Sequence, residues 1–231
     1  MTGTISLVPV TGLPEIAPGD DLAGMIAEAA DLADGDVVVV TQKIVSKAED
    51  RVVDIDLAVG HKPLVEAESV RVLRRRGDLV ISETEHGFVC ANAGIDLSNV
   101  AEGRAALLPV DSDRSARRIR DALRHRLGVE VAVIVSDTFG RPWRAGVTDV
   151  AIGCAGLRPV VDLRGTTDAL GRELQVTEVA VVDELAAAAE LVMGKASGVP
   201  VAVIRGVDPS WFGDGSVVAD VVRSPEDDLF R

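Results

Sequence analysis

Short, continuous runs of β-branched residues alternate with helix-like segments, and this alternation limits the fold more than any other feature of the chain. Such aliphatic runs are typical of strands that are covered on both faces. They lie at residues 36–45, 131–140, 177–185 and 199–206, and the helix-like segments lie at 21–33, 113–127 and 183–194. The pattern predicts a mixed α/β protein. With no low-complexity linker among its 231 residues, the chain is expected to form a single domain over 1–231.

The helix-like segments carry their own start and stop signals. Asp113 and Asp183 are suited to be N-caps, and Gly128 and Gly194 stand where C-terminal glycines are common. The segment 113–127 also carries many arginines, which predict a solvated face or, as the alternative, a surface that meets phosphate. These are Arg117, Arg118, Arg120, Arg124 and Arg126.

Composition excludes several classes of function. The formal net charge of −13 repels nucleic acid and anionic membranes over long range, and only 3% of the residues are aromatic, so base-stacking platforms are not expected. Cys90 and Cys154 lack metal-finger spacing and are expected to be reduced and structural. Neither a leader nor an apolar run of about 18 residues is present, which predicts a cytoplasmic protein. The glycine- and proline-rich stretch 139–172 is expected to contain strands and to border a functional surface.

Two carboxylates are candidates for a metal site. Asp137 and Thr138 follow directly on the run 131–135, and ligands of α/β sheets gather at the carboxyl ends of strands. Mg²⁺ and Mn²⁺ prefer oxygen ligands of this kind, although an N-cap or turn aspartate is the alternative. Asp96 precedes Ser98 and Asn99 within a few residues, which suits either an Asx turn or a metal and phosphate site.

Two further segments are candidates for phosphate binding. Lys43 and Lys47 come at the end of an apolar run, where lysines meet phosphate or simply lie in solvent. Around the turn at 191–200, Ala189 and Ala196 stand where a P-loop needs Gly and Ser or Thr, so no P-loop is predicted. The backbone N–H groups of the turn can still wrap a phosphate. Other catalytic motifs are absent from the sequence, and the three histidines are scattered.

Several segments together resemble the coenzyme F-420 gamma-glutamyl ligase family, and in particular the N-terminal ligase domain of its actinobacterial form. The similarity runs from about residue 6 to 230. The segments include LVPVTGLPEIAPGDDL, DGDVVVVTQKIVSKAE, GIDLSNV, LLPVDSD, VSDTFGRPWRAGVTDVAIGCAGL, VTEVAVVDELAAAAELVMGKASGVPVAVIRG and DDLF.

The resemblance implies a GTP-dependent ligase that adds L-glutamate to a coenzyme F-420 precursor through an acyl phosphate and releases GDP and phosphate. It also implies one or two Mg²⁺ or Mn²⁺ ions, with K⁺ as a further candidate, and a homodimer whose mixed α/β fold has two intertwined lobes. The nitroreductase-like domain of longer relatives is absent from these residues. A related ligase for another carboxylate, or a non-catalytic nucleotide-binding dimerisation module, are the alternatives.

Site residues follow from the resemblance by position, and none is expected to be catalytic beyond the metal and nucleotide ligands. Asp96 and Asp137 are expected to bind the first metal and Thr138 the second, while Arg141 and Arg144 are candidates for the acidic tail of the substrate. The residues expected at the nucleotide are Leu13, Pro14, Glu15, Ile16, Gln42, Lys47, Asn99, Met193, Gly194, Lys195, Ala196, Ser197, Gly198, Val199 and Pro200.

Two positions depart from the family pattern. Lys195 stands where archaeal members often have a glutamine that binds metal, and a charged ammonium cannot do so. Gln42 stands where those members commonly have serine.

Overall fold

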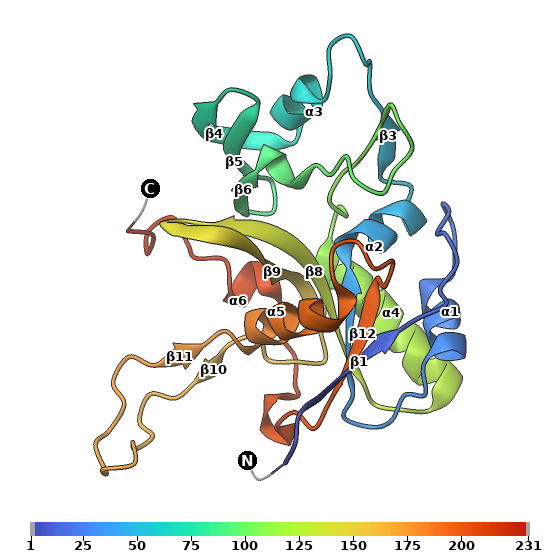
Figure 1. Ribbon diagram of the computed structural model, residues 1–231. Helices are drawn as coiled ribbons and strands as arrows, with labels where there is room; N and C mark the ends of the chain where they lie inside the picture. The colour runs from blue at the N-terminus through green and yellow to red at the C-terminus, as the bar shows by residue number, and fades with distance from the viewer. Residues whose placement is uncertain (1–2, 230–231) are drawn as a thin grey trace.

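The computed structural model describes residues 3–229, and its centre is a mixed five-stranded sheet in the order β1-β12-β2-β8-β9 (Figure 1). Only the central pair, β2 and β8, is parallel, and the other neighbours are antiparallel. The strands are β1 (Ser6–Val10), β2 (Val37–Thr41), β8 (Ala132–Arg141), β9 (Arg144–Ala155) and β12 (Val201–Arg205).

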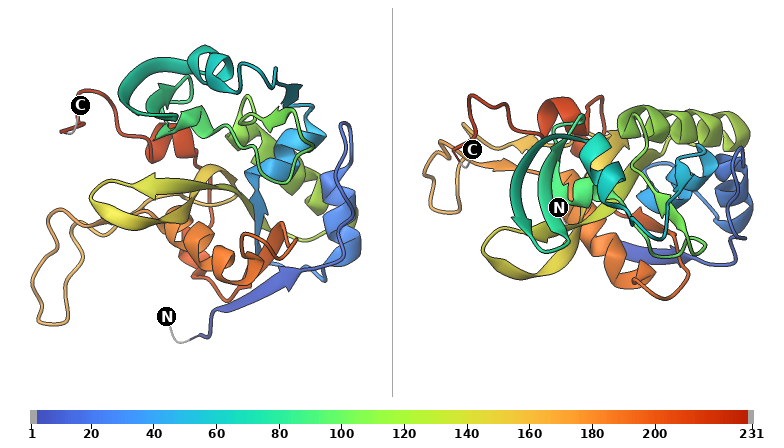
Figure 2. Two further views of the ribbon diagram at one scale, coloured as in Figure 1. Left: turned by 45° about the horizontal axis from the view of Figure 1, so that its top comes forward. Right: turned by 90° about the horizontal axis from the view of Figure 1, so that it is seen from above.

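Helices cover both faces of this sheet, as the view from above shows (Figure 2). α4 (Ser112–Leu127) packs on β8 and β9 from one side together with α1 (Leu22–Ala29), and α5 (Val181–Met193) packs from the other. The short α6 (Val217–Asp220) also contacts β9, and η2 spans Pro209–Trp211. The buried strands therefore read as continuous aliphatic runs because neither face meets water.

A second, smaller body is inserted between α2 (Gln42–Ala48) and α4, and lies at one end of the main sheet (Figure 1). It contains a three-stranded sheet, a two-stranded sheet and two short helices. These elements are β3 (Val52–Asp54), α3 (Lys62–Ala67), β4 (Ser69–Arg76), β5 (Leu79–Thr84), β6 (Val89–Ala91), η1 (Asn92–Gly94) and β7 (Arg104–Ala106). A mixed α and β architecture is thus confirmed.

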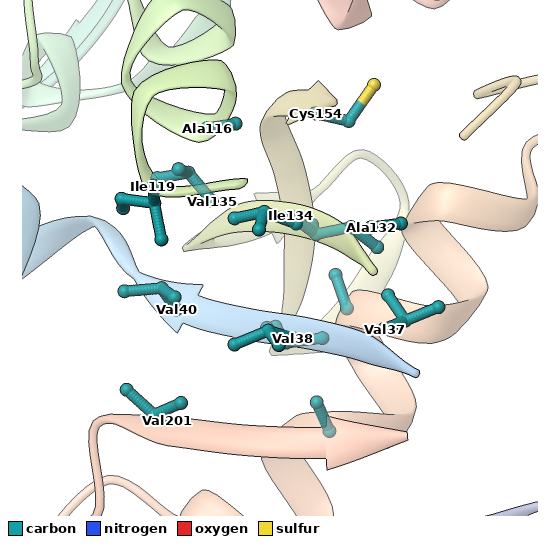
Figure 3. Packing of buried hydrophobic residues seen from close by; sticks show 14 of the residues in the cluster. Val37, Val38, Val40, Ala116, Ile119, Ala132, Ile134, Val135, Cys154 and Val201 are labelled. Atoms are coloured by element: carbon teal, nitrogen blue, oxygen red, sulfur yellow. The ribbon is translucent and has the colours of Figure 1, made fainter. Parts of the chain in front are cut away.

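The core consists almost entirely of small aliphatic side chains. Val37, Val38 and Val40 of β2 meet Ile134 and Val135 of β8, and all five are fully buried (Figure 3). Burying each such side chain contributes about 1.5–3 kcal/mol. The low aromatic content of the sequence is therefore compatible with a tightly packed interior.

Two strand predictions were wrong in their extent. The run 36–45 stops being a strand at Thr41, and the helix α2 begins at Gln42, so the four-residue spacing of Lys43 and Lys47 is a helical spacing. The run 177–185 contributes only β11 (Glu178–Val179) before α5 begins at Val181. Its apolar residues at 181, 182, 185, 186 and 189 recur with the helical period, and this amphipathic face outweighs the strand propensity of the valines.

The predicted helix ends were right at the C-terminal glycines and wrong at the N-caps. Gly128 and Gly194 have φ of 71° and 63°, which glycine adopts without strain. The N-cap of α4 is Asp111, and α5 has no side-chain cap, at Ala180. Asp113 instead receives hydrogen bonds from the backbone of Cys154 and Val217. The helix expected over 21–33 ends at Ala29.

Other sequence predictions are confirmed. The stretch 139–172 contains β9 and β10 (Val161–Asp162), which pairs with β11. Arg117, Arg118, Arg124 and Arg126 of α4 are exposed, as the solvated-face interpretation requires. Both cysteines are free and buried. Within residues 3–229, no helix combines the length and apolarity that crossing a membrane would need.

Candidate functional site

The carboxylate of Asp137 is the most perturbed acidic group of the site. Strand β8 brings Asp137 in directly after its buried run, and a β-bulge between Val135 and Ser136 alters the pairing with β9 just before it. Burial, with the nearby charges of Asp96 and Asp149, raises the pKa of Asp137 to about 7, against the backbone hydrogen bond from Thr138 and the charge of Lys195. A carboxylate in this position gains from a bound cation.

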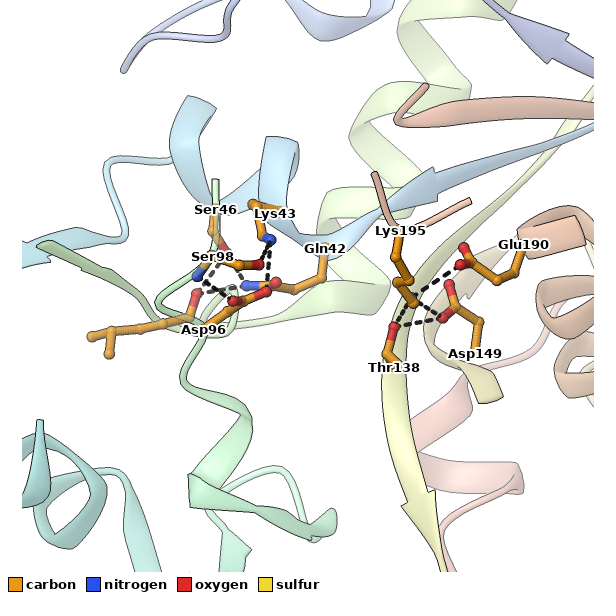
Figure 4. Close-up of polar contacts among 10 residues, drawn as sticks. Gln42, Lys43, Ser46, Asp96, Ser98, Thr138, Asp149, Glu190 and Lys195 are labelled. Carbon is orange, nitrogen blue, oxygen red and sulfur yellow. Dashed lines mark hydrogen bonds and ion pairs between the residues drawn. The ribbon is translucent and has the colours of Figure 1, made fainter. Parts of the chain in front are cut away.

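Asp96 lies near Asp137 but has partners of its own. Its Oδ1 accepts a hydrogen bond of 2.6 Å from the Ser98 backbone, and its Oδ2 lies 2.7 Å from Lys43 Nζ (Figure 4). Burial acts to raise the pKa of Asp96, yet the hydrogen bonds from Lys43 and Ser98 hold it below its usual value. The Asx-turn interpretation of this segment is therefore present in the structure, together with proximity to Asp137.

Thr138 and Lys195 belong to a second polar cluster, beside the first in Figure 4. Lys195 Nζ contacts Thr138 Oγ1 and lies 2.7 Å from Asp149 Oδ1 and 3.4 Å from Glu190 Oε1. Thr138 Oγ1 also donates to Asp149 Oδ1 over 2.6 Å. Burial acts to lower the pKa of Lys195, but the hydrogen bond with Asp149 outweighs it, and the pKa is raised overall.

The protein alone does not complete a metal shell. Within the described chain, no three His, Cys, Asp or Glu side chains are grouped so that they could hold a metal ion. A cation between Asp96 and Asp137 would therefore take further ligands from water and substrate phosphate, which is how Mg²⁺ is commonly bound beside nucleotides.

Four of the residues expected at the nucleotide line one cavity of about 250 Å³. They are Glu15, Ile16, Lys47 and Asn99, and Arg104 is among the other lining residues. Lys47 Nζ forms an ion pair with Glu15 there. Asn99 has φ of 53°, a conformation that asparagine tolerates well, so turn geometry explains part of its presence. A second cavity in the described part of the chain, lined by residues such as Glu68, Thr84 and His86, includes none of the predicted site residues.

The remaining predicted residues are placed differently. Gln42 is buried, and its side-chain amide donates to Ser46 Oγ over 2.6 Å and to the Leu107 carbonyl over 2.8 Å. Met193 lies fully inside the core, while residues 194–198 are exposed. Neither Leu13 and Pro14 nor the turn 193–200 lines the cavity of Glu15 and Lys47. Arg141 and Arg144 are exposed at the end of the β8–β9 hairpin.

Comparison with known proteins decides the family. A sequence model described as F420-0:gamma-glutamyl ligase matches residues 12–206, which is most of the chain. The chain belongs to the F420-0:gamma-glutamyl ligase family.

Curated archaeal relatives of this ligase family match the chain over nearly its full length, and all carry the name coenzyme F420:L-glutamate ligase. The relative from Methanothermobacter thermautotrophicus is 47% identical over 98% of this chain and 99% of its own. The relative from Methanopyrus kandleri is 44% identical over 99% and 98%, and that from Haloarcula marismortui is 43% identical over 96% and 94%.

Sequence reasoning missed Asp149, Glu190 and Arg104. Asp149 is opposite Thr138 in the β8–β9 register, and Glu190 reaches the same cluster from α5. The available signal for Asp149 was that it is the single charged residue in the segment 147–152, which is otherwise mostly apolar.

Proposed function

We propose that the chain joins L-glutamate to a carboxylate of a coenzyme F-420 precursor, with GTP and a divalent cation. The relatives named coenzyme F420:L-glutamate ligase support this substrate pair. The observation that carries the proposal is the connection between the acidic pair and the cavity. Helix α2 presents Lys43 to Asp96 and, one turn later, Lys47 to the cavity, and Asn99 follows Ser98 into the same cavity.

The residues present fit a hard divalent cation. Asp137 is a half-buried carboxylate whose pKa rises to about 7 through desolvation and neighbouring negative charge, so a cation would stabilise its ionised form. Asp96 would share that cation. When bound, the cation would neutralise negative charge on the phosphate groups during phosphoryl transfer.

The chemistry needs no nucleophilic side chain. The precursor carboxylate attacks the γ-phosphorus of GTP, GDP leaves, and an acyl phosphate forms. The amine of L-glutamate, after losing a proton, attacks the acyl carbon and displaces phosphate, leaving an amide. Burial raises the pKa of both cysteine thiols to about 12, which argues against catalysis by a thiolate.

The role of the chain's own residues is to bind and align. Lys47 and Arg104 supply positive charge around the cavity of about 250 Å³, and Lys43 holds the Asp96 turn in place. Positioning and charge neutralisation of this kind account for most of the rate enhancement in phosphoryl transfer.

The experiment is an assay of glutamate addition by mass spectrometry with GTP or ATP, Mn²⁺, L-glutamate and the precursor. Amide product with GTP, and loss of product on chelation, is the expected result. Equal use of ATP would remove the guanine preference, and no product with any tested carboxylate would favour a non-catalytic module. Product from a different carboxylate alone would identify a related ligase.

A substitution of Lys47 tests whether GTP binds in the cavity that Lys47 lines. Lys47→Met removes one of the two cationic side chains that line it and is expected to weaken GTP binding about tenfold in calorimetry, since a charge-assisted contact with phosphate is lost. Lys62→Met, at an exposed pair with Asp78, is the matched control. Unchanged GTP affinity in Lys47→Met would move the nucleotide away from this cavity.

A further inference from the structure

We infer that the ammonium group of Lys195 is a built-in cation of the active site, so that this chain binds one divalent cation where a neutral residue at 195 would allow two. The inference rests on the proposed function and deepens it, because it states how the positive charge of the site is divided between protein and metal.

Three oxygen ligands from three separate elements surround the ammonium group. Thr138 comes from β8, Asp149 from β9 and Glu190 from α5, and Lys195 Nζ lies within 2.7 Å of Asp149 Oδ1 and 3.4 Å of Glu190 Oε1 (Figure 4). Hydroxyl and carboxylate oxygens are also the ligands that Mg²⁺ and Mn²⁺ prefer. The position of Nζ is therefore one that suits a small hard cation.

Burial makes a cation necessary at this position. The side chain of Asp149 is only 2% exposed, and a buried carboxylate without a counter-charge is strongly destabilising. Among the described residues, the other hydrogen-bond donors to this carboxylate are hydroxyl groups. Ser136 donates to Asp149 Oδ2 over 3.1 Å, and Thr138 donates to Oδ1 over 2.6 Å. Lys195 is the cation that balances this carboxylate in the structure.

The ammonium also remains accessible from the site. The Lys195 side chain is 53% exposed, in contrast to Asp149, and Thr138 connects it along the backbone to Asp137. An ammonium in this position can meet a phosphate or carboxylate oxygen of the substrates as a point charge. Lys195 would thus supply the charge of an ion without ever dissociating.

The test is a count of bound Mn²⁺ in the full chain, without turnover. Equilibrium dialysis against Mn²⁺ is expected to give one ion per chain for the unaltered protein and two for Lys195→Gln, because the glutamine carbonyl and the freed oxygens can bind a second ion. Lys62→Gln, which removes an exposed lysine of the same charge, is expected to keep one. An unchanged count in folded Lys195→Gln would overturn the inference.

A second variant and a second measurement guard against misfolding. Adding Asp149→Asn to Lys195→Gln is expected to abolish the gained ion. In the unaltered protein saturated with Mn²⁺, electron paramagnetic resonance is expected to show the spectrum of an isolated ion, whereas spin coupling between two ions would overturn the inference by itself. Absence of any bound Mn²⁺ would instead contradict the proposed metal site of Asp96 and Asp137.

Discussion

At the scale of single residues, Asp137 is a carboxylate whose pKa the fold raises to about 7. Its carboxylate is ordinary in the sequence, where it only ends an apolar run, and it becomes unusual because the fold buries it near Asp96 and Asp149. A residue in such surroundings destabilises the metal-free protein and stabilises the complex. Stability and ligand binding are therefore expected to change in opposite directions when it is neutralised.

Asp137→Asn is expected to stabilise the metal-free protein at high pH. The folded pKa of about 7 lies well above the usual pKa of an aspartate, so the native state keeps its proton to a higher pH than the unfolded chain does. The unaltered protein therefore loses stability as pH rises between these two pKa values. The stability gained by the variant is expected to reach roughly 1–3 kcal/mol above pH 7 and to vanish near pH 3, where the carboxyl is protonated in both states. Denaturant unfolding of the metal-free proteins across pH measures it.

The exposed Asp121 of α4 provides the control, because Asp121→Asn is expected to show no such pH-dependent gain. Added Mn²⁺ should raise the melting temperature of the unaltered protein and leave that of Asp137→Asn nearly unchanged. A similar Mn²⁺ response in both would show that Asp137 does not bind the ion.

At the scale of elements, helix α2 is where the sequence and the structure differ most. Its first residues read as a continuation of the strand 37–41, yet Ile44 and Val45 turn inward with Ser46 on a helical face. The Gln42 amide is bonded to Ser46 and to the Leu107 carbonyl, which ties α2 to the segment after β7. The nucleotide contact of Gln42 stays a prediction. Its side-chain amide is already hydrogen-bonded to Ser46 and Leu107 inside the protein.

Gln42→Met is expected to lower the free energy of unfolding by about 1–3 kcal/mol, because two buried hydrogen bonds are lost. GTP affinity of the folded variant is expected to stay unchanged, as calorimetry can show. Gln175→Met at an exposed position is the matched control. A large loss of GTP affinity without loss of stability would assign Gln42 to the nucleotide instead.

The close packing of β9 against α4 gives a second prediction for an element. A Cβ at Gly153 would lie 2.2 Å from the Ser112 carbonyl carbon, which belongs to the backbone and cannot rotate away. Gly153→Ala is therefore expected to destabilise the protein by about 1–3 kcal/mol or more. Gly140→Ala, on the same hairpin with open space around it, should cost far less in the same denaturant titration. Equal stability of the two variants would show that α4 shifts easily.

At the scale of the whole molecule, an extended arm around β10 and β11 projects from the main body (Figure 1). Its connecting segment carries Leu170 and Val176, which are 81% and 85% exposed. Exposed apolar groups on a projecting segment favour burial against another chain. The homodimer expected from the family resemblance is still a prediction, and we expect its interface at this arm.

The double variant Leu170→Asp with Val176→Asp is expected to convert a dimer to a monomer, since two charges would be buried at the contact. Light scattering after gel filtration measures the mass directly. Leu191→Asp, at an 81% exposed position of α5, is the control that should keep the dimer. A dimer that survives the double variant would place the interface elsewhere.

The sequence by itself determined that strands lie within the runs 36–45 and 199–206 and along 131–140, and it also located the arginine-rich helix and placed Asp137 at the end of an apolar run. These features depend on local periodicity and on which residues follow a strand, and both are visible in one dimension. The family resemblance assigned Asp96 and Asp137 to one metal and named the nucleotide residues, of which Glu15, Ile16, Lys47 and Asn99 line one cavity.

Only the tertiary structure decided which charges face each other. Lys195 lies 46 residues from Asp149 in sequence, and their contact depends on the β8–β9 register and on the end of α5. Likewise the raised pKa of Asp137 arises from burial by elements far along the chain, and Gln42 is buried because α2 packs beside Leu107. Such pairings are set by long-range packing, which no local pattern records.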